Sequence, residues 1–108
     1  MANNFRNGQV RIANEILDQL AIRASEEING VHTPQANDNK LNISQNGPKS
    51  TVSQVDGKLH VNLIVNLDKN VNVKKTVKDI QENVVRVIES MTGLRVSRVN
   101  VDVPKLVF

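Results

Sequence analysis

The sequence predicts an α+β domain, a two-layer sandwich in which two helices pack on one face of a small, mixed but antiparallel-rich sheet. Two stretches with apolar residues every three or four positions predict the helices, and alternating apolar and polar residues predict the strands. The expected order is β-α-β-β-α-β, and the sequence leaves the order of strands in the sheet open. A chain of 108 residues suits a single domain, which we expect to cover residues 1–108.

The first strand and the first helix are expected near the N-terminus. Val10 and Ile12 alternate with polar neighbours, which indicates a short strand. In the helix that follows, Asn14 is the expected N-cap and Gly30 the expected C-terminal stop. One apolar stripe is expected to face the core, made of Ile16, Leu17, Leu20, Ala21, Ala24 and Ile28.

A long flexible loop and then a hairpin are expected in the middle of the chain. Residues 32–50 are rich in Asn, Ser, Pro and Gly and predict the loop, with room for one short edge strand at 41–44. Asp56 and Gly57 predict the tight turn of a hairpin within 51–67, because glycine tolerates the positive φ of a type I′ turn. In its second strand, the buried face is expected to hold Leu59, Val61, Leu63, Val65 and Leu67, and the solvent face His60, Asn62, Ile64 and Asn66.

The second helix is the best-defined element, with Asn72 as its cap and Gly93 as its end. Its core stripe is expected to be Val77, Ile80, Val84, Val87, Ile88 and Met91. In the last strand, Val96 is out of phase with Val99, Val101 and Val103, so we expect a bulge near Ser97 and Arg98. Pro104 is expected to leave residues 105–108 free.

Composition limits the chemistry that we expect of this chain. There are no cysteines, which excludes disulfides, thiolate zinc sites and thiol catalysis. The two histidines, His32 and His60, lie on different predicted elements, whereas zinc needs three or four ligands. No serine lies in a hydrolase motif, and no glycine cluster forms a nucleotide cradle. We therefore expect no enzyme activity, no cofactor and no metal site. Neither a signal peptide nor a membrane span is predicted.

Positive charge gathers in the second half of the chain, which carries the whole net charge of +3. Lys74, Lys75 and Lys78 cluster in the first turns of the second helix, where they oppose the helix dipole but lie beside N–H donors that suit an anion. A solvated lysine-rich surface is the simpler interpretation. With Arg95 as an extension, the cluster leaves open a small basic nucleic-acid-binding module of the KH type.

Three segments carry a resemblance to a known family. The first runs from Gly8 to Val31, and the second is the Asp56-Gly57 turn with its following strand. The third and most specific comprises the runs IQENV at 80–84, ESMTGL at 89–94 and VNVDV at 99–103. In these segments the chain resembles the alkaline-shock-protein family, the cell-envelope stress response proteins of Gram-positive bacteria. It differs in carrying Asp68-Lys69 where members usually have a tyrosine–glycine pair.

The resemblance implies a non-enzymatic, cytoplasmic protein of the stress response and of cell-envelope homeostasis, without catalytic residues. Some such proteins are held at the inner face of the membrane by a small membrane-anchored protein and tend to self-assemble. We therefore expect a protein partner, self-association into oligomers and no direct membrane span, with nucleic-acid binding as the alternative. The expected working surfaces are a free sheet edge, the solvent face at His60, Asn62, Ile64 and Asn66, and a basic group made of Lys74, Lys75, Lys78 and Arg95.

Overall fold

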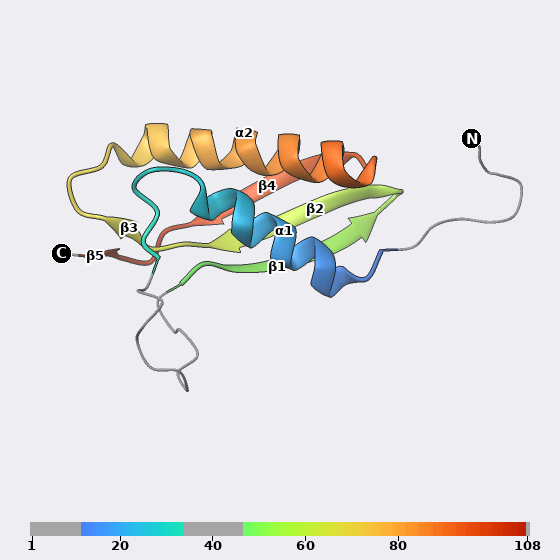
Figure 1. The fold of residues 1–108 in the computed structure, drawn as a ribbon, viewed down its shortest axis with the longest axis horizontal. Coiled ribbons are helices and arrows are strands. Elements are labelled where there is room, and N and C mark those ends of the chain that lie inside the picture. The colour runs from blue at the N-terminus through green and yellow to red at the C-terminus, as the bar shows by residue number, and fades with distance from the viewer. Residues whose placement is uncertain (1–11, 34–46, 108) are drawn as a thin grey trace, which may run out of the picture.

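The computed structural model of the chain describes residues 12–33 and 47–107 (Figure 1). The elements in these residues are α1 (Asn14–Glu26), β1 (Lys49–Val55), β2 (Lys58–Ile64), β3 (Leu67–Asp68), α2 (Val73–Thr92), β4 (Val96–Asp102) and β5 (Leu106–Val107). The strand expected at 10–12 falls outside the described residues except for Ile12, which packs against the core without forming a strand. The edge strand expected at 41–44 lies entirely outside them.

The main sheet has three strands in the order β1-β2-β4. β1 runs antiparallel to β2, whereas β4 runs parallel to it, so α2 lies in the crossover between two parallel strands. Both helices cover the same face of this sheet, with α1 mainly over β1 and α2 over β4 (Figure 1). The predicted fold class, two helices on one face of a mixed sheet, is confirmed.

The core lies between the helices and the sheet. Both helices and the central strand contribute fully buried side chains: Leu17, Ala21 and Ala24 from α1, Leu59, Val61 and Leu63 from β2, and Ile80, Val84 and Ile88 from α2. The predicted stripes are wrong at two positions, since Ile16 is 53% and Met91 68% exposed. Ile16 lies about 100° around the helix from Leu17 and so points past the sheet. Met91 is in phase with its stripe, but it lies in the last turn of α2, beyond the core.

The predicted turns of the main sheet are confirmed. Asp56 and Gly57 both have positive φ, 55° and 79°, as a type I′ hairpin requires. The register between β2 and β4 passes from Leu59↔Val96 to His60↔Arg98, so Ser97 is the extra residue of the expected bulge. At the two ends of α2, the side chain of Asn72 accepts a hydrogen bond from the Lys75 amide, and Gly93 is left-handed with φ 75°.

The predicted limits of α1 are wrong by a few residues. α1 is capped by Ala13 without a side-chain hydrogen bond, and it ends at Glu26 rather than at Gly30. Gly30 instead turns the chain, with φ 103°, against Val71. Of the loop expected at 32–50, residues 34–46 lie outside the described residues; at its two ends, the His32 amide donates to the Asn66 carbonyl at 2.8 Å and β1 begins at Lys49.

The chain end is not free, contrary to the prediction. β5 pairs in parallel with β3, and the Lys69 amide donates to the Val107 carbonyl at 2.9 Å. Pro104 interrupts the pairing of β4, but the backbone donors and acceptors resume pairing two residues later. On its other side, β3 bonds to the segment after α1, since the Asp68 amide donates to the Gly30 carbonyl at 2.8 Å. This small second sheet lies at one end of the molecule, beside the start of α2 (Figure 1).

Candidate interaction surfaces

One face of the main sheet is left open by the described elements, because both helices lie on the other side (Figure 1). The strand register lines up three rows of side chains across this face: Ser53, His60 and Arg98; Thr51, Asn62 and Asn100; and Lys49, Ile64 and Asp102. We call these nine residues the open face. All of them are exposed except His60, which is half-buried.

The middle row of the open face is held by a side-chain hydrogen bond, in which the Asn100 amide donates to the Asn62 amide oxygen at 3.0 Å. Ile64 is 44% exposed between a lysine and an aspartate. A hydrophobic side chain in a polar row is a natural contact point, since its burial by a partner would be favourable by about 25 cal/mol per Å². The row also gives the face one cationic and one anionic group, on either side of Ile64.

Of the four solvent-face residues predicted on the second strand, His60, Asn62 and Ile64 lie on the open face and Asn66 does not. Asn66 is only 8% exposed, because β2 ends at Ile64 and the alternation stops there. Sequence reasoning missed Arg98 and Asn100 as members of this face. The signal was available in the bulge at Ser97, which brings both residues into phase with His60 and Asn62.

The two edges of the main sheet are less free than expected. At β1, the Val52 amide donates to the Asp18 carboxylate of α1 at 2.8 Å. At β4, the Val99 carbonyl accepts from the Gln81 side chain of α2 at 3.1 Å. Each bond occupies a backbone group near the middle of an edge strand that an added strand would otherwise use. The helices therefore cover the sheet and also protect its edges.

The predicted basic group divides into two parts. Lys74, Lys75 and Lys78 are exposed in the first turns of α2, but Arg95 follows the other end of this 20-residue helix. At 1.5 Å per residue the two ends are about 30 Å apart, so Arg95 does not extend the lysine cluster. Lys75 pairs with Asp79 at 2.9 Å on the surface, and Asn72 already occupies the amide of Lys75. The first turn of α2 contains no acidic residue, although one there would be favourable by about 0.3–1 kcal/mol.

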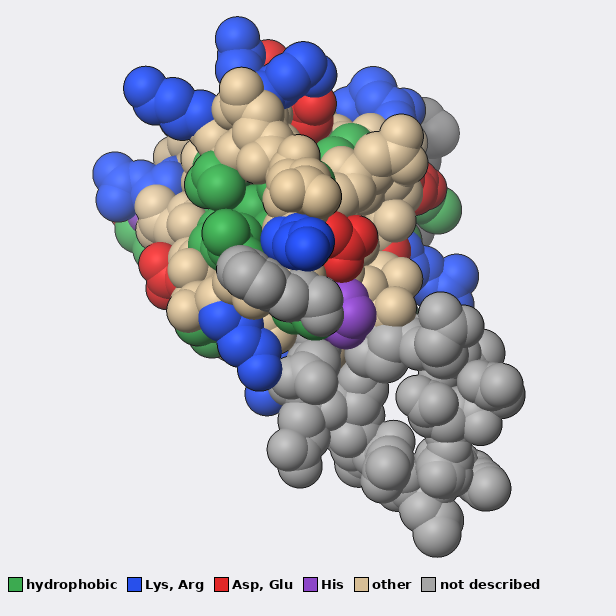
Figure 2. Space-filling view, turned by 90° about the vertical axis from the view of Figure 1, so that its left-hand side faces the viewer, with side chains coloured by type: hydrophobic (Ala, Val, Ile, Leu, Met, Phe, Trp, Pro, Cys, Tyr) green, Lys and Arg blue, Asp and Glu red, His purple; other side chains and the backbone are tan. Residues whose placement is uncertain are grey.

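The fold brings two further lysines to the same end of the molecule, and sequence reasoning missed both. Lys69 follows β3 and Lys105 precedes β5, so the pairing of these strands places them beside the start of α2. We call the set Lys69, Lys74, Lys75, Lys78 and Lys105 the lysine end. Figure 2 looks onto this end and shows blue Lys and Arg side chains around a surface on which green hydrophobic side chains are also visible.

A polar contact joins α2 to the C-terminal end of α1. The Asn83 amide of α2 donates to the Ala24 carbonyl and to the Glu27 carboxylate, both at 2.8 Å. Its side-chain oxygen accepts a hydrogen bond from Arg86. Asn83 is only 9% exposed, so this contact fixes how the end of α1 sits on α2.

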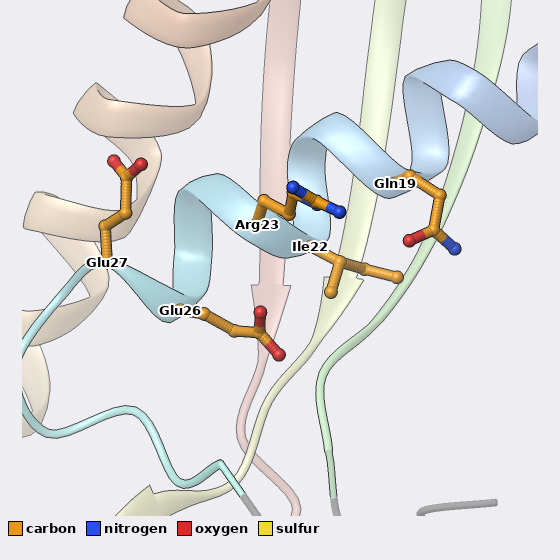
Figure 3. A pocket seen from close by; sticks show the side chains of 5 residues that line it. All are labelled: Gln19, Ile22, Arg23, Glu26 and Glu27. Carbon is orange, nitrogen blue, oxygen red and sulfur yellow. The ribbon is translucent and has the colours of Figure 1, made fainter. Parts of the chain in front are cut away.

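The outer side of α1 carries a shallow hollow lined by Gln19, Ile22, Arg23, Glu26 and Glu27. Figure 3 shows these side chains projecting from successive turns of α1 and from its C-terminal end, not around a common point. Their charges are mixed, and Glu27 is already bound by Asn83. The arrangement gives no reason to assign a ligand to this hollow.

The sequence runs that carry the family resemblance have structural roles in this fold. In the run at 89–94, the Glu89 carboxylate accepts from the Val96 amide at 2.9 Å, and Thr92 accepts from the Leu94 amide at 3.0 Å. These bonds and the left-handed Gly93 shape the turn from α2 into β4. In the run at 80–84, Gln81 and Asn83 make the contacts described above. In these two runs, the residues that resemble the family stabilise the fold.

The comparisons with known proteins identify the family of this chain. No helix among the described residues is long and apolar enough to cross a membrane. Comparison with curated proteins found no match, and comparison with solved structures found none. A family model for alkaline shock proteins, described by a cell envelope-related function, matches residues 2–108. Because this match spans nearly the whole chain, the chain belongs to the alkaline shock protein family, which has a cell envelope-related function.

Proposed function

We propose that this protein is a non-enzymatic member of the envelope stress response that acts through protein–protein contacts and self-association, with the open face as the contact surface. The observation that supports this most directly is the exposed Ile64, 44% accessible, in the polar rows of a sheet face that no described element covers. The non-enzymatic part of the proposal is supported by a sequence in which we find no catalytic motif. The envelope role follows from the family.

Association through the open face fits the structure better than pairing of sheet edges. Edge pairing would have to displace Asp18 from Val52 or Gln81 from Val99. A contact between two open faces needs no such displacement. In a twofold arrangement with β4 antiparallel to its copy about Asn100, Arg98 of one copy would face Asp102 of the other, which makes the surface self-complementary.

The test is light scattering over a wide range of protein concentration. We expect the mass of the wild-type protein to rise with concentration, and Ile64→Arg to shift the protein towards monomer. Met91→Arg is the matched control, since Met91 is also an exposed hydrophobic residue, 68% accessible, but lies on α2 away from the open face. A strict monomer at every concentration would refute self-association. Equal effects of the two variants would refute the open face as its site.

A further inference from the structure

We propose that the lysine end binds directly to an anionic lipid surface, in addition to any contact made by the open face. The whole net charge of the protein lies in residues 67–80 and 103–107, which hold five lysines against two aspartates. The rest of the chain holds nine cationic and nine anionic residues and is neutral. The protein is therefore electrically asymmetric, with its positive pole at one end of the fold.

Asymmetry at this end remains after its internal ion pairs are considered. Asp79 lies against Lys75, and Asp68 lies 3.2 Å from His32. Lys74, Lys78 and Lys105 are exposed, and none of them forms an ion pair with a described residue. Asp102 borders this end on the open face, and counting it still leaves an excess of two positive charges. The positive end of the α2 dipole points the same way.

The lysine end also exposes aliphatic side chains. Val73, the first residue of α2, is 40% exposed, and Leu106 of β5 is 41% exposed. Lysines with aliphatic neighbours suit the boundary between lipid headgroups and acyl chains, because the lysine stems cover apolar surface while their ammonium groups reach the headgroups. Nucleic-acid bases stack on aromatic side chains, so the exposed Val73 and Leu106 would add nothing to nucleic-acid binding beyond what the lysines contribute.

The shape of the charged surface favours an extended anionic partner over a small anion. The five lysines come from three separate places in the chain, namely the end of β3, the first turns of α2 and the link into β5. Figure 2, which looks onto this end, shows blue Lys and Arg side chains spread around it, with red Asp and Glu side chains among them. A bilayer rich in acidic headgroups is anionic over its whole area, so it can meet all of them at once.

The test is co-sedimentation of the full chain with vesicles of phosphatidylcholine alone or with about one-third phosphatidylglycerol. We expect binding only to the anionic vesicles and a steep loss of binding as salt rises from about 50 mM to about 300 mM. Lys74→Gln with Lys78→Gln should weaken binding about 25-fold, or about fivefold per lysine. Lys58→Gln with Arg95→Gln is the matched control, because it removes the same charge from the opposite end of the molecule, at the start of β2 and beyond the C-terminal end of α2. It should change binding no more than about twofold.

Three results would overturn the proposal. The first is no binding to anionic vesicles at low salt. The second is an equal loss in the two double variants, which would mean that net charge alone matters. The third is a combination of two observations: Leu106→Ser does not change vesicle binding, and the wild-type protein binds duplex DNA more tightly than it binds the vesicles. That result would assign this end to nucleic acid. Since self-association is measured without vesicles, failure of one proposal is distinguishable from failure of the other.

Discussion

Asn83 provides the sharpest test of how the two helices are held together. Its side-chain amide is the hydrogen-bond donor to the Ala24 carbonyl, and Ala24 is fully buried near the end of α1. In Asn83→Ala this carbonyl loses its side-chain partner, and an unsatisfied buried carbonyl costs about 1–3 kcal/mol. The other two partners, Glu27 and Arg86, are exposed and can bind water instead.

The expected loss of stability follows from these terms. The gain in helix propensity from Asn to Ala is about 0.5 kcal/mol and partly offsets the loss of the hydrogen bond. We therefore expect Asn83→Ala to lower the free energy of unfolding by about 1.5 kcal/mol and the Tm by about 6–12 °C. Asn83→Asp keeps the size of the side chain but replaces the donor by an oxygen facing a carbonyl and a carboxylate. It should destabilise at least as much.

Urea and thermal denaturation followed by circular dichroism measure both quantities. Glu82→Ala is the control, because Glu82 is the exposed neighbour of Asn83 on the same helix. Its free energy of unfolding should stay within about 0.5 kcal/mol of the wild type. The reasoning would be refuted if Asn83→Ala matched this control, or if Asn83→Asp were as stable as the wild-type protein.

Three further predictions concern backbone conformation, the sheet edge and surface exposure. Gly93→Ala should lower the free energy of unfolding by about 1–2 kcal/mol, because φ at Gly93 is 75° although the space around it is open. Gly30→Ala should lower it further, because φ there is 103° and the new Cβ would lie 2.8 Å from Val71 Cγ1. Equal losses of the two variants in urea titrations would contradict this. Asp18→Ala should lower stability by about 1–2 kcal/mol and make light scattering rise faster with concentration, whereas Asp18→Asn, which keeps an acceptor for the Val52 amide, should stay closer to the wild type in both assays. Met91→Lys should change the Tm by no more than about 3 °C, and a larger drop would show that Met91 is buried after all.

The sequence predicted the fold class and most turns because each depended on a local pattern. The alternation from Leu59 to Leu63, the Asp56-Gly57 pair and the Gly93 stop all act over a few residues. The errors arose where a distant partner decided the outcome. Asn66 is buried beyond the end of β2, where its carbonyl accepts from the His32 amide, and residues 106–107 are paired because β3 lies beside them. No local pattern contains that information.

The same distinction applies to the candidate surfaces. His60, Asn62 and Ile64 could be grouped from one strand alone, whereas Arg98 and Asn100 required the register between β2 and β4. The sequence alone does not separate Arg95 from the helix lysines, because only the 20-residue length of α2 places it at the opposite end of the molecule. Lys69 and Lys105 joined the lysine end only through the pairing of β3 with β5.

That pairing has a consequence for how the protein opens. β3 and β5 have two residues each, so only a few backbone hydrogen bonds hold together segments almost forty positions apart, and this small sheet should separate more easily than the main sheet. Amide hydrogen exchange should therefore begin at Leu67 and Lys69 well before it reaches the amides of β2. Two lysines of the lysine end, Lys69 and Lys105, flank these two strands. Contact with a charged surface would slow exchange there first, which makes these amides a local reporter of binding.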